Sequence, residues 1–399
     1  MTRRFQFNRM ELAGSLGDLG TLLPLALGMI IINRLDPLSL FFCVGIYYIY
    51  SGIYFGVTAP VEPMKVIAAY AVATGISAAQ IFASSALLAI SLLLIGGTGA
   101  ITLVGRFIPK SVIRGVQVST GVLLVSQGVK LMLGASAFQA IKKAAEPYLA
   151  IQNLGPIPIG ILIGVILVAL TLLLLENKRF PAALVIGLVG AAIGLLIGTH
   201  EGLDRLRIGL NFPSLLPVGM PSLQDFVGAM VILVLPQLPM TLGNAVIANA
   251  DLSREYFGET AKKVSYSGLC ISMAVANFLS FFLGGMPMCH GAGGLASRYR
   301  FGARTAGSNI LSGLFFLSLA VFLGVHSLSI LYLLPLSALG VLLVFAGSQL
   351  TLTLLDMKTR KDLFVPMIIV GITLASNLAV GFLTGILLAY ALKSDRVTI

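Results

Sequence analysis

Long apolar stretches alternate with short polar breaks along the whole chain, which is the pattern of a membrane protein with many helices. Most of the stretches approach the roughly 20 residues that a helix needs to cross the hydrocarbon core of a bilayer. In the first half, helices are predicted near residues 11–32, 37–56, 60–75, 77–107, 109–133, 156–176 and 181–199. After a polar connection, more are predicted near 222–249, 263–285, 287–300, 303–323, 327–355, 363–377 and 378–393.

These segments predict an all-α membrane protein of about fourteen transmembrane helices, with two halves of seven helices each. We expect a first repeat over residues 1–199, an outer connection over 200–221 and a second repeat over 222–399. The last two segments are short enough to form one broken hairpin instead of two full spans.

Composition agrees with lipid as the solvent, since 57% of residues are hydrophobic, 10% are charged and the mean hydropathy is +1.00. The net charge of +11 is spread singly and in pairs over short loops, so it predicts topology and no nucleic-acid partner. The three cysteines have no metal-ligand spacing, and neither a metal nor another cofactor is expected. The first helix has no small-residue cleavage site, so we expect it to remain in the mature protein.

Placing the N-terminus in the cytoplasm puts nineteen basic residues inside and six outside, as the positive-inside rule requires. Seven helices that start inside end outside, so the second half must run with the opposite topology and both termini must be cytoplasmic. This predicts an inverted repeat. Weak internal echoes agree: Gly17-Asp18-Leu19-Gly20 corresponds to Pro236-Gln237-Leu238-Pro239, and Ala59-Pro60-Val61-Glu62 to Met286-Pro287-Met288-Cys289.

The third and tenth predicted helices are expected to be broken half-helices. Pro60 and Pro63 bracket the start of one, and Pro287 with the glycines after His290 opens the other. Free backbone N–H groups at two such helix starts form an anion site. Pro63 suits a first helical position, which makes Glu62 the expected N-cap. The alternative is that proline and glycine only kink ordinary helices.

Polar groups inside apolar spans are costly and need a reason. Lys65 lies three residues after Glu62, which permits an ion pair that is either structural or functional. A carboxylate at this helix start would compete with a bound anion unless it were protonated, so Glu62 is a candidate proton carrier. His290 is either a candidate site residue or a satisfied core histidine.

These motifs together resemble the molybdate transporter family, which is related to the SulP sulfate permeases. The chain departs from the family pattern at Glu62, where glutamine is usual, and no cytoplasmic STAS domain is expected. The matching segments are Gly14-Ser15-Leu16-Gly17-Asp18-Leu19-Gly20-Thr21, Pro60-Val61-Glu62-Pro63-Met64-Lys65, Pro236-Gln237-Leu238-Pro239, Met286-Pro287-Met288-Cys289-His290-Gly291-Ala292-Gly293-Gly294 and Tyr299-Arg300-Phe301-Gly302-Ala303-Arg304.

The resemblance implies a core domain of helices 1–4 and 8–11 and a gate domain formed by the rest. Substrate would bind between the starts of helices 3 and 10, walled by helices 1 and 8. Together with the polar residues inside the spans, this gives the expected substrate-binding residues: Asp18, Thr21, Glu62, Met64, Lys65, Gln237, Asn244, Cys289, His290, Gly291, Ala292 and Gly293.

The expected function is secondary active import of a tetrahedral oxyanion, foremost molybdate, across the plasma (inner) membrane in symport with protons. Glu62 is the first proton-coupling candidate, and Asp18 or His290 is the second. Sulfate transport, anion exchange, a passive anion channel and a membrane-embedded enzyme are the alternatives. No enzyme is expected, because no nucleophile accompanies Asp18 and His290 in a recognisable motif. Tungstate is a further candidate ligand, and a homodimer is left open.

Overall fold

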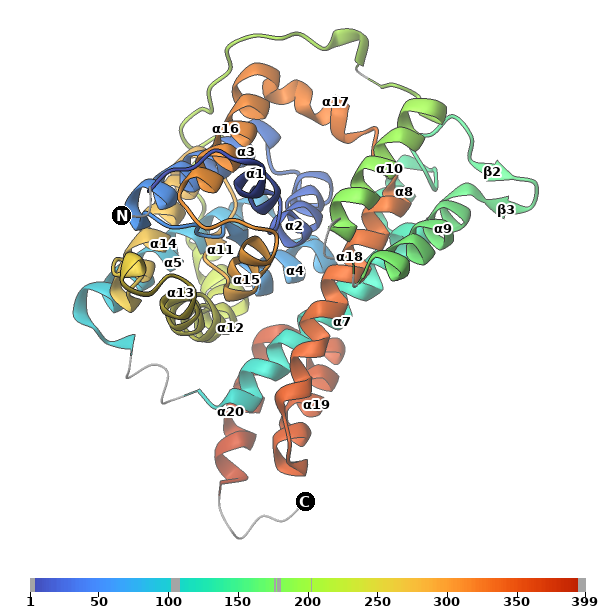
Figure 1. Ribbon diagram of the computed structural model, residues 1–399. Helices are drawn as coiled ribbons and strands as arrows, with labels where there is room; N and C mark the ends of the chain where they lie inside the picture. Colours follow the sequence, from blue (N-terminus) through green and yellow to red (C-terminus); the bar gives the residue numbers. More distant parts are fainter. Residues whose placement is uncertain (1–3, 102–107, 176, 178–180, 202, 394–399) are drawn as a thin grey trace.

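The computed structural model describes residues 4–101, 108–175, 177, 181–201 and 203–393, and helices dominate it (Figure 1). The first half contains α1 (Arg9–Ser15), α2 (Leu19–Ile31), α3 (Pro37–Phe55), β1 (Glu62–Pro63), α4 (Lys65–Thr74), α5 (Ala78–Thr98), α7 (Lys110–Met132), α8 (Ala137–Lys142), β2 (Asn153–Leu154), β3 (Ile157–Pro158), α9 (Ile159–Leu174) and α10 (Ala182–Ile197). The second contains α11 (Leu223–Ala229), α12 (Leu235–Met240), α13 (Asn249–Phe257), α14 (Tyr266–Leu283), β4 (Met288–Cys289), α15 (Ala292–Arg300), α16 (Gly307–Ser318), α17 (Ser327–Leu331), α18 (Leu336–Thr351), α19 (Arg360–Ala375) and α20 (Leu378–Ala391).

The helical membrane architecture is confirmed. Across the described residues, eight helices or helical runs are long and apolar enough to cross a membrane, and α4, α9, α10 and α20 are shorter apolar helices. Every apolar run of the sequence overlaps at least one helix. The end of the fourth predicted helix, residues 102–107, lies outside the described residues. The number of spans stays a prediction.

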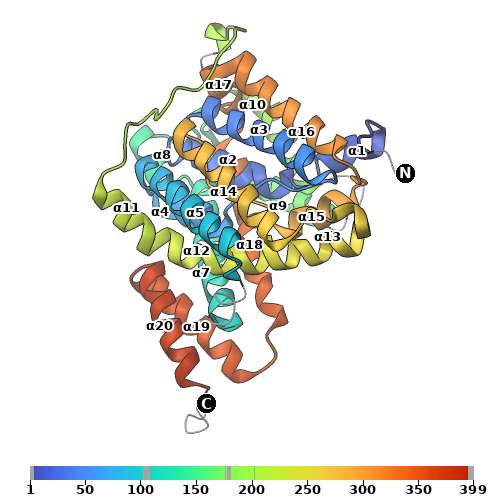
Figure 2. The same ribbon diagram turned by 90° about the vertical axis from the view of Figure 1, so that its left-hand side faces the viewer.

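The helices form two groups. Helices α1–α5 and α11–α16 make up the first group, and α7, α9, α10 and α18–α20 make up the second, which extends away toward the C-terminus (Figures 1 and 2). The groups meet where α4 and α12 pack on α7, and where α2 packs on α10 and α18. Any space along this boundary is therefore lined by both helix groups.

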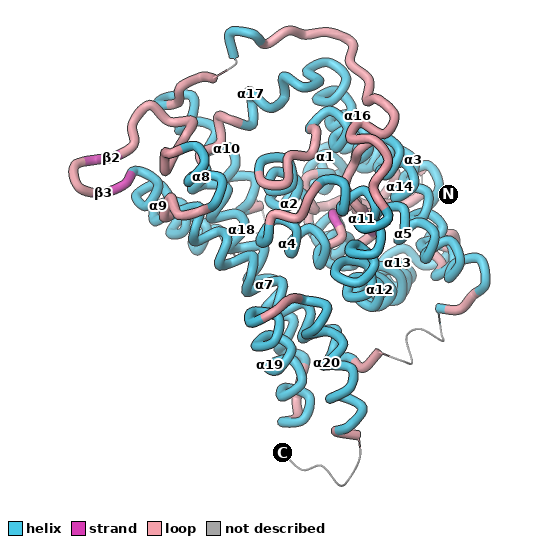
Figure 3. The backbone as a smooth tube through the Cα atoms, turned by 180° about the vertical axis from the view of Figure 1, so that it is seen from behind, coloured by secondary structure: helices cyan, strands magenta, loops and turns pink. Residues whose placement is uncertain are grey.

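Two short strands of the first group pair with each other, and each leads into a short helix. Strands β1 and β4 are antiparallel, with Glu62 opposite Cys289 and Pro63 opposite Met288. Helix α4 begins two residues after β1, and α15 begins three residues after β4. The other strand pair, β2 with β3, is a peripheral hairpin far from these helix starts (Figure 3).

This pairing corrects one local prediction. Glu62 is not the N-cap of α4, and Pro63 is not its first residue, because the strand keeps both residues extended. Met64 is the N-cap, and its backbone N–H donates to the carbonyl of Pro287 at 2.9 Å. The proline-rich segment therefore serves to link the two half-helices to each other.

Residues 223–257 form one irregular helical run opposite these helix starts. Helices α11, α12 and α13 alternate in it with π-helical turns at 230–234 and 241–248. Pro236 and Pro239 lie within the run, and neither can donate a backbone hydrogen bond. π-helical turns and prolines locally change the direction of side chains, and the run directs Gln237 toward α4.

Candidate functional site

Gln237 occupies the N-terminus of α4. Its side-chain oxygen accepts hydrogen bonds from the backbone N–H groups of Val66 at 2.9 Å and Ile67 at 3.2 Å. Its amide nitrogen donates to the Thr241 hydroxyl at 2.8 Å, which fixes the orientation of the amide group. These two N–H groups are among those that a helix start leaves unpaired. The uncharged side chain of Gln237 thus satisfies two of the backbone N–H groups that would otherwise attract an anion to this helix start.

Glu62 and Lys65 form the charged centre of the site. Lys65 Nζ lies 3.2 Å from Glu62 Oε2, so the predicted ion pair is confirmed. The Glu62 side chain is completely buried, whereas 15% of the Lys65 side chain remains exposed. Within the described part of the chain, neither Glu62 oxygen receives a well-oriented hydrogen bond. A buried carboxylate with a single counter-charge is an incompletely stabilised anion.

The start of α15 supplies the other wall around Glu62. A side chain at Gly291 would collide with Glu62 Oε2, and one at Gly294 would come within 2.8 Å of Oε1. The absence of side chains therefore lets the carboxylate approach the backbone at the start of α15. Glu62 consequently lies next to the first turn of α15 while it also pairs with Lys65 on α4.

A cavity of about 460 Å³ lies between the two helix groups beside this pair. The first group contributes Lys65 and Arg300 to its wall, together with Asn244 and the backbone near Gly293. The second group contributes polar side chains from α7 and α18. The cavity wall therefore contains two cations and several neutral polar groups. Its further lining includes Gly17, Gly20, Thr21, Gln117, Ser297, Gln349 and Thr353.

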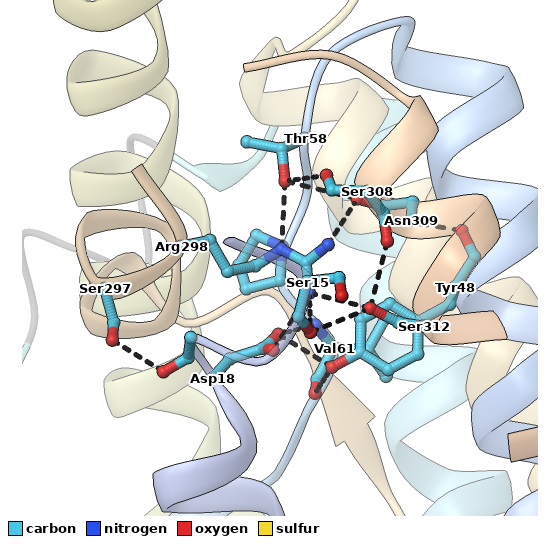
Figure 4. Close-up of polar contacts among 12 residues, drawn as sticks. Ser15, Asp18, Tyr48, Thr58, Val61, Ser297, Arg298, Ser308, Asn309 and Ser312 are labelled. Atoms are coloured by element: carbon cyan, nitrogen blue, oxygen red, sulfur yellow. Dashed lines mark hydrogen bonds and ion pairs between the residues drawn. The ribbon is translucent and has the colours of Figure 1, made fainter. Parts of the chain in front are cut away.

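Asp18 is held by Arg298 in a fully buried ion pair, with Nη1 2.9 Å from Oδ1 (Figure 4). The second carboxylate oxygen of Asp18 accepts from the Tyr48 hydroxyl at 2.7 Å and from the Val61 N–H at 3.2 Å. The guanidinium also donates to several neighbours. Its further acceptors are the Thr58 hydroxyl, the Ser15 carbonyl, the Ser312 hydroxyl and the Asn309 side-chain oxygen.

This network ties α2, α3, β1 and α15 together. Arg298 is one of the nineteen basic residues that the positive-inside count places on the cytoplasmic side, and its fully buried side chain pairs with Asp18. The signal that was available is an acidic residue in the first helix, Asp18, which needs a buried partner.

His290 is also fully buried, and both of its ring nitrogens are engaged. Nδ1 lies 2.7 Å from the Pro60 carbonyl, while Nε2 lies 2.6 Å from the Tyr47 hydroxyl and 2.9 Å from the Ser272 hydroxyl. A carbonyl can only accept, so Nδ1 carries a hydrogen, and in the neutral ring Nε2 accepts from the hydroxyls. The ring thus links the segment before β1 to α3 and α14, and it is not part of the cavity wall.

The predicted site residues divide into those that line the cavity and those behind it. Thr21, Lys65, Asn244 and Gly293 line it. Glu62 contacts Lys65 from behind, and Gln237 binds the α4 backbone. The others lie in the crossing that supports the two helix starts, and their substrate contacts stay predictions: Asp18, Met64, Cys289, His290, Gly291 and Ala292.

The sequence did not predict the part of the cavity wall that the second helix group contributes. Gln117 of α7 accepts from Arg114 at 2.7 Å and from Thr353 at 3.2 Å, and Gln349 of α18 joins them in the lining. Amide side chains inside apolar spans were the available signal. No sequence pattern indicated that these two helices face α4 and α15.

Solved structures share this architecture. The chain matches murine Slc26a9, described as an anion transporter in the inward-facing state, with a TM-score of 0.68 and 16% identity, covering 99% of this chain and 70% of that one. The transmembrane domain of the cyanobacterial bicarbonate transporter BicA matches with a TM-score of 0.64 and 16% identity, covering 96% and 97%. The chain therefore has the multi-pass helical fold of these two membrane proteins.

Sequence comparison narrows the class. A family model described as a molybdate transporter of the MFS superfamily matches residues 10–124 and 229–350. Molybdate transporter 2 of Arabidopsis thaliana is 32% identical, covering 96% of this chain and 87% of that protein. Molybdate transporter 1 of Chlamydomonas reinhardtii is 30% identical, covering 96% and 91%. The chain belongs to the molybdate transporter family, and the predicted resemblance is confirmed.

Proposed function

We propose that this protein imports molybdate together with protons, and that substrate binds between the starts of α4 and α15 on the cavity side. The observation that carries the proposal is the position of Glu62. Its carboxylate pairs with Lys65 and lies against the glycine-lined start of α15. A buried anion belonging to the protein thus lies at the kind of site that attracts anions from solution.

Glu62 couples protonation to binding in this scheme. A molybdate dianion and an ionised Glu62 would repel each other at close range. When Glu62 takes up a proton, Lys65 is released to interact with the incoming anion. Glu62 is therefore the first proton carrier, and substrate and proton bind together because each favours the other.

The charge of the substrate requires such coupling. Moving a dianion into a negative-inside cell costs roughly 4.6 kcal/mol per 100 mV, twice the value for one charge. Two protons make the cycle electroneutral. Asp18 and His290 are the candidates for the second proton. The Asp18 carboxylate is paired with the counter-charge of Arg298. The ring nitrogens of His290 are hydrogen-bonded to two hydroxyls and a carbonyl.

The movement we propose is a shift of the first helix group, the core, against the second group, the gate. Two features support an inverted repeat over residues 1–199 and 222–399, joined by 200–221. Strand β1 pairs antiparallel with β4, as a two-fold relation demands. In addition, α3 packs on α16 and α14 packs on α5, so that the second helix of each half contacts the fourth helix of the other. The protein then lies in the plasma (inner) membrane, with both termini in the cytoplasm.

Transport by purified protein in liposomes tests the coupling. We expect molybdate uptake to rise when the outside is acidified, and Glu62→Gln to retain molybdate binding while uptake no longer responds to pH. Glu259→Gln is the matched control, because this carboxylate is exposed and pairs only with the exposed Lys262 among the described residues. An unchanged pH response in Glu62→Gln rejects Glu62 as the proton carrier.

Calorimetry of the same protein tests the substrate. Tight binding of molybdate and tungstate with weak binding of sulfate is the expected result. Lys65→Gln should abolish binding, because the cavity loses the cation at the start of α4. Preferred binding of sulfate would assign sulfate transport, and failure of all three anions would reject an oxyanion site here.

A further inference from the structure

A second cavity, of about 380 Å³, lies in the first helix group away from the candidate substrate site. It is bounded by the N-terminal segment at Arg4, the end of α3 and the connection between α13 and α14. No residue is shared between the linings of the two cavities. The wall consists of Arg4, Tyr54, Phe55, Gly56, Val57, Thr260, Lys262, Lys263 and Thr305.

Among the residues that the structure describes, three cations and no carboxylate line this second cavity. Lys263 Nζ lies 5.7 Å from the centre of the Tyr54 ring, which holds the ammonium beside the cavity. Lys262 pairs at 3.2 Å with Glu259, but both side chains are more than 80% exposed, so water screens this pair strongly. Among the described residues, the cavity lining therefore carries a net positive charge, and its only acidic partner is the exposed Glu259 beside Lys262.

Arg4 has a second effect on the charge of the cavity. It donates a hydrogen bond to the Ile53 carbonyl in the last turn of α3. Carbonyls at a helix C-terminus carry partial negative charge and would repel an anion. The guanidinium covers the C-terminal end of α3. The side of the cavity formed by Gly56 and Val57 therefore does not repel an anion.

Two threonine hydroxyls also line the wall, and that of Thr260 donates to the Phe257 carbonyl at 2.6 Å, which leaves Thr305 as the threonine donor. Thr305 Oγ1 accepts from the backbone N–H groups of Gln6 at 3.1 Å and Gly307 at 3.2 Å. Two accepted bonds orient its own hydrogen away from those groups. The lining thus offers ammonium, guanidinium and hydroxyl donors together, which is the donor set that a phosphate group needs.

The surroundings point to a lipid as the source of that phosphate. Phe5 and Phe7 lie one and three residues after Arg4, and they are 37% and 62% exposed. Exposed aromatic side chains beside basic residues are typical of segments at a membrane interface. Basic pockets between membrane helices are known sites for phosphorylated lipid headgroups. We propose that this cavity binds the phosphate headgroup of an anionic lipid and anchors the N-terminal segment to the end of α3 and the connection before α14.

The test compares the melting temperature of the purified full chain across ligand concentrations. Dioctanoyl phosphatidic acid is the probe, dioctanoyl phosphatidylcholine is the zwitterionic control with no net charge, and inorganic phosphate is the headgroup without its lipid. A ligand that binds the folded state raises the melting temperature with its concentration. We expect a rise with phosphatidic acid and none with phosphatidylcholine.

Variants locate the effect. Lys262→Gln with Lys263→Gln should increase the half-maximal concentration of phosphatidic acid by roughly thirtyfold, the change expected for two lysines near an anionic headgroup. Lys358→Gln with Arg360→Gln removes the same charge outside this cavity and should leave the response unchanged. Lys65→Gln should also leave it unchanged, so that anion binding in the substrate cavity is recognised separately.

Each result decides the proposal. An equal response to inorganic phosphate, lost in the Lys262 and Lys263 double variant, would keep the phosphate site and replace its lipid source with a free anion. A phosphatidic acid response that survives in that double variant, or that is lost in Lys65→Gln instead, would overturn the site. No response to phosphatidic acid or phosphate would overturn it as well. None of these results depends on whether molybdate is the transported substrate.

Discussion

Arg298 and Asp18 form an ion pair with no solvent exposure at either side chain, and the two residues lie 280 positions apart in the sequence. The pair joins the start of α2 to α15, so it connects the two halves of the chain at the back of the candidate site. Removing one member leaves the other as an uncompensated buried charge, which is far more costly than losing an exposed pair.

We therefore predict that Asp18→Ala and Arg298→Ala each destabilise the protein by about 3–5 kcal/mol. Melting temperature in detergent measures the effect. The double substitution should cost less than the sum of the two single ones, because it leaves no unpaired charge. Glu259→Gln, in the exposed pair with Lys262, should leave the melting temperature unchanged. Strict additivity of the two core substitutions would show that the pair is not coupled.

This pair also marks where sequence reasoning reached its limit. Asp18 was singled out because an acidic residue inside an apolar span needs a reason. Arg298 does not stand out in the same way, because it lies close to Arg300 and Arg304 at the basic end of the predicted helix 287–300. Charge patterning along the chain cannot tell a solvated arginine from one that folds back onto a carboxylate 280 residues earlier.

Local sequence patterns predicted the structure more accurately than charge patterning did at the prolines and glycines near the two half-helices. The prolines and glycines predicted two half-helices, and α4 and α15 both begin after a short extended segment. The Glu62–Lys65 ion pair followed from spacing alone. The N-cap assignment failed because β1 pairs with β4, a contact between residues more than 200 positions apart. Similarly, the cavity wall formed by Gln117 and Gln349 depends on packing of the second group.

The glycine at the start of α15 gives a second prediction. Gly291→Ala should destabilise the protein by about 1–3 kcal/mol, the usual cost of overpacking, because the new methyl group collides with Glu62. Glu62→Ala in the same chain should recover most of this loss. Gly293→Ala is the matched control, since its nearest neighbour would be Lys65 Nζ at 3.9 Å. Failure of Glu62→Ala to rescue would place the strain elsewhere.

A third prediction concerns charge at the start of α4. Gln237→Glu can still accept from Val66 and Ile67, so the fold should remain intact. The added carboxylate would repel an oxyanion at this helix end, and molybdate affinity should fall at least tenfold. Calorimetry measures the affinity, and the melting temperature verifies folding. Thr241→Val removes only the partner of the Gln237 amide nitrogen and should have a smaller effect. Unchanged affinity in Gln237→Glu would separate this helix end from the substrate.

Glu146, in the loop after α8, gives a prediction about helix capping. Its two carboxylate oxygens accept from the backbone N–H groups of Leu336 and Ser337 at the start of α18, both at 2.8 Å. Glu146→Ala leaves these groups without their acceptor, so it should cost about 1–2 kcal/mol. Glu146→Gln retains an acceptor and should cost less. Asp225→Ala, which removes an exposed capping box at α11, is the control for loss of a solvated cap.

The same residue predicts how stability changes with pH. Burial raises the pKa of Glu146, although the hydrogen bonds from Ser337 and Leu336 lower it in part. The folded state then binds the proton more tightly than the unfolded chain, so the stabilisation is complete below the ordinary glutamate pKa of about 4.3. It is lost as the pH rises from there through the raised pKa. Melting temperature of the wild type, measured relative to Glu146→Gln, should therefore fall over this interval, because the glutamine does not titrate. A relative rise instead would mean that the two N–H donors of α18 outweigh burial and hold Glu146 ionised.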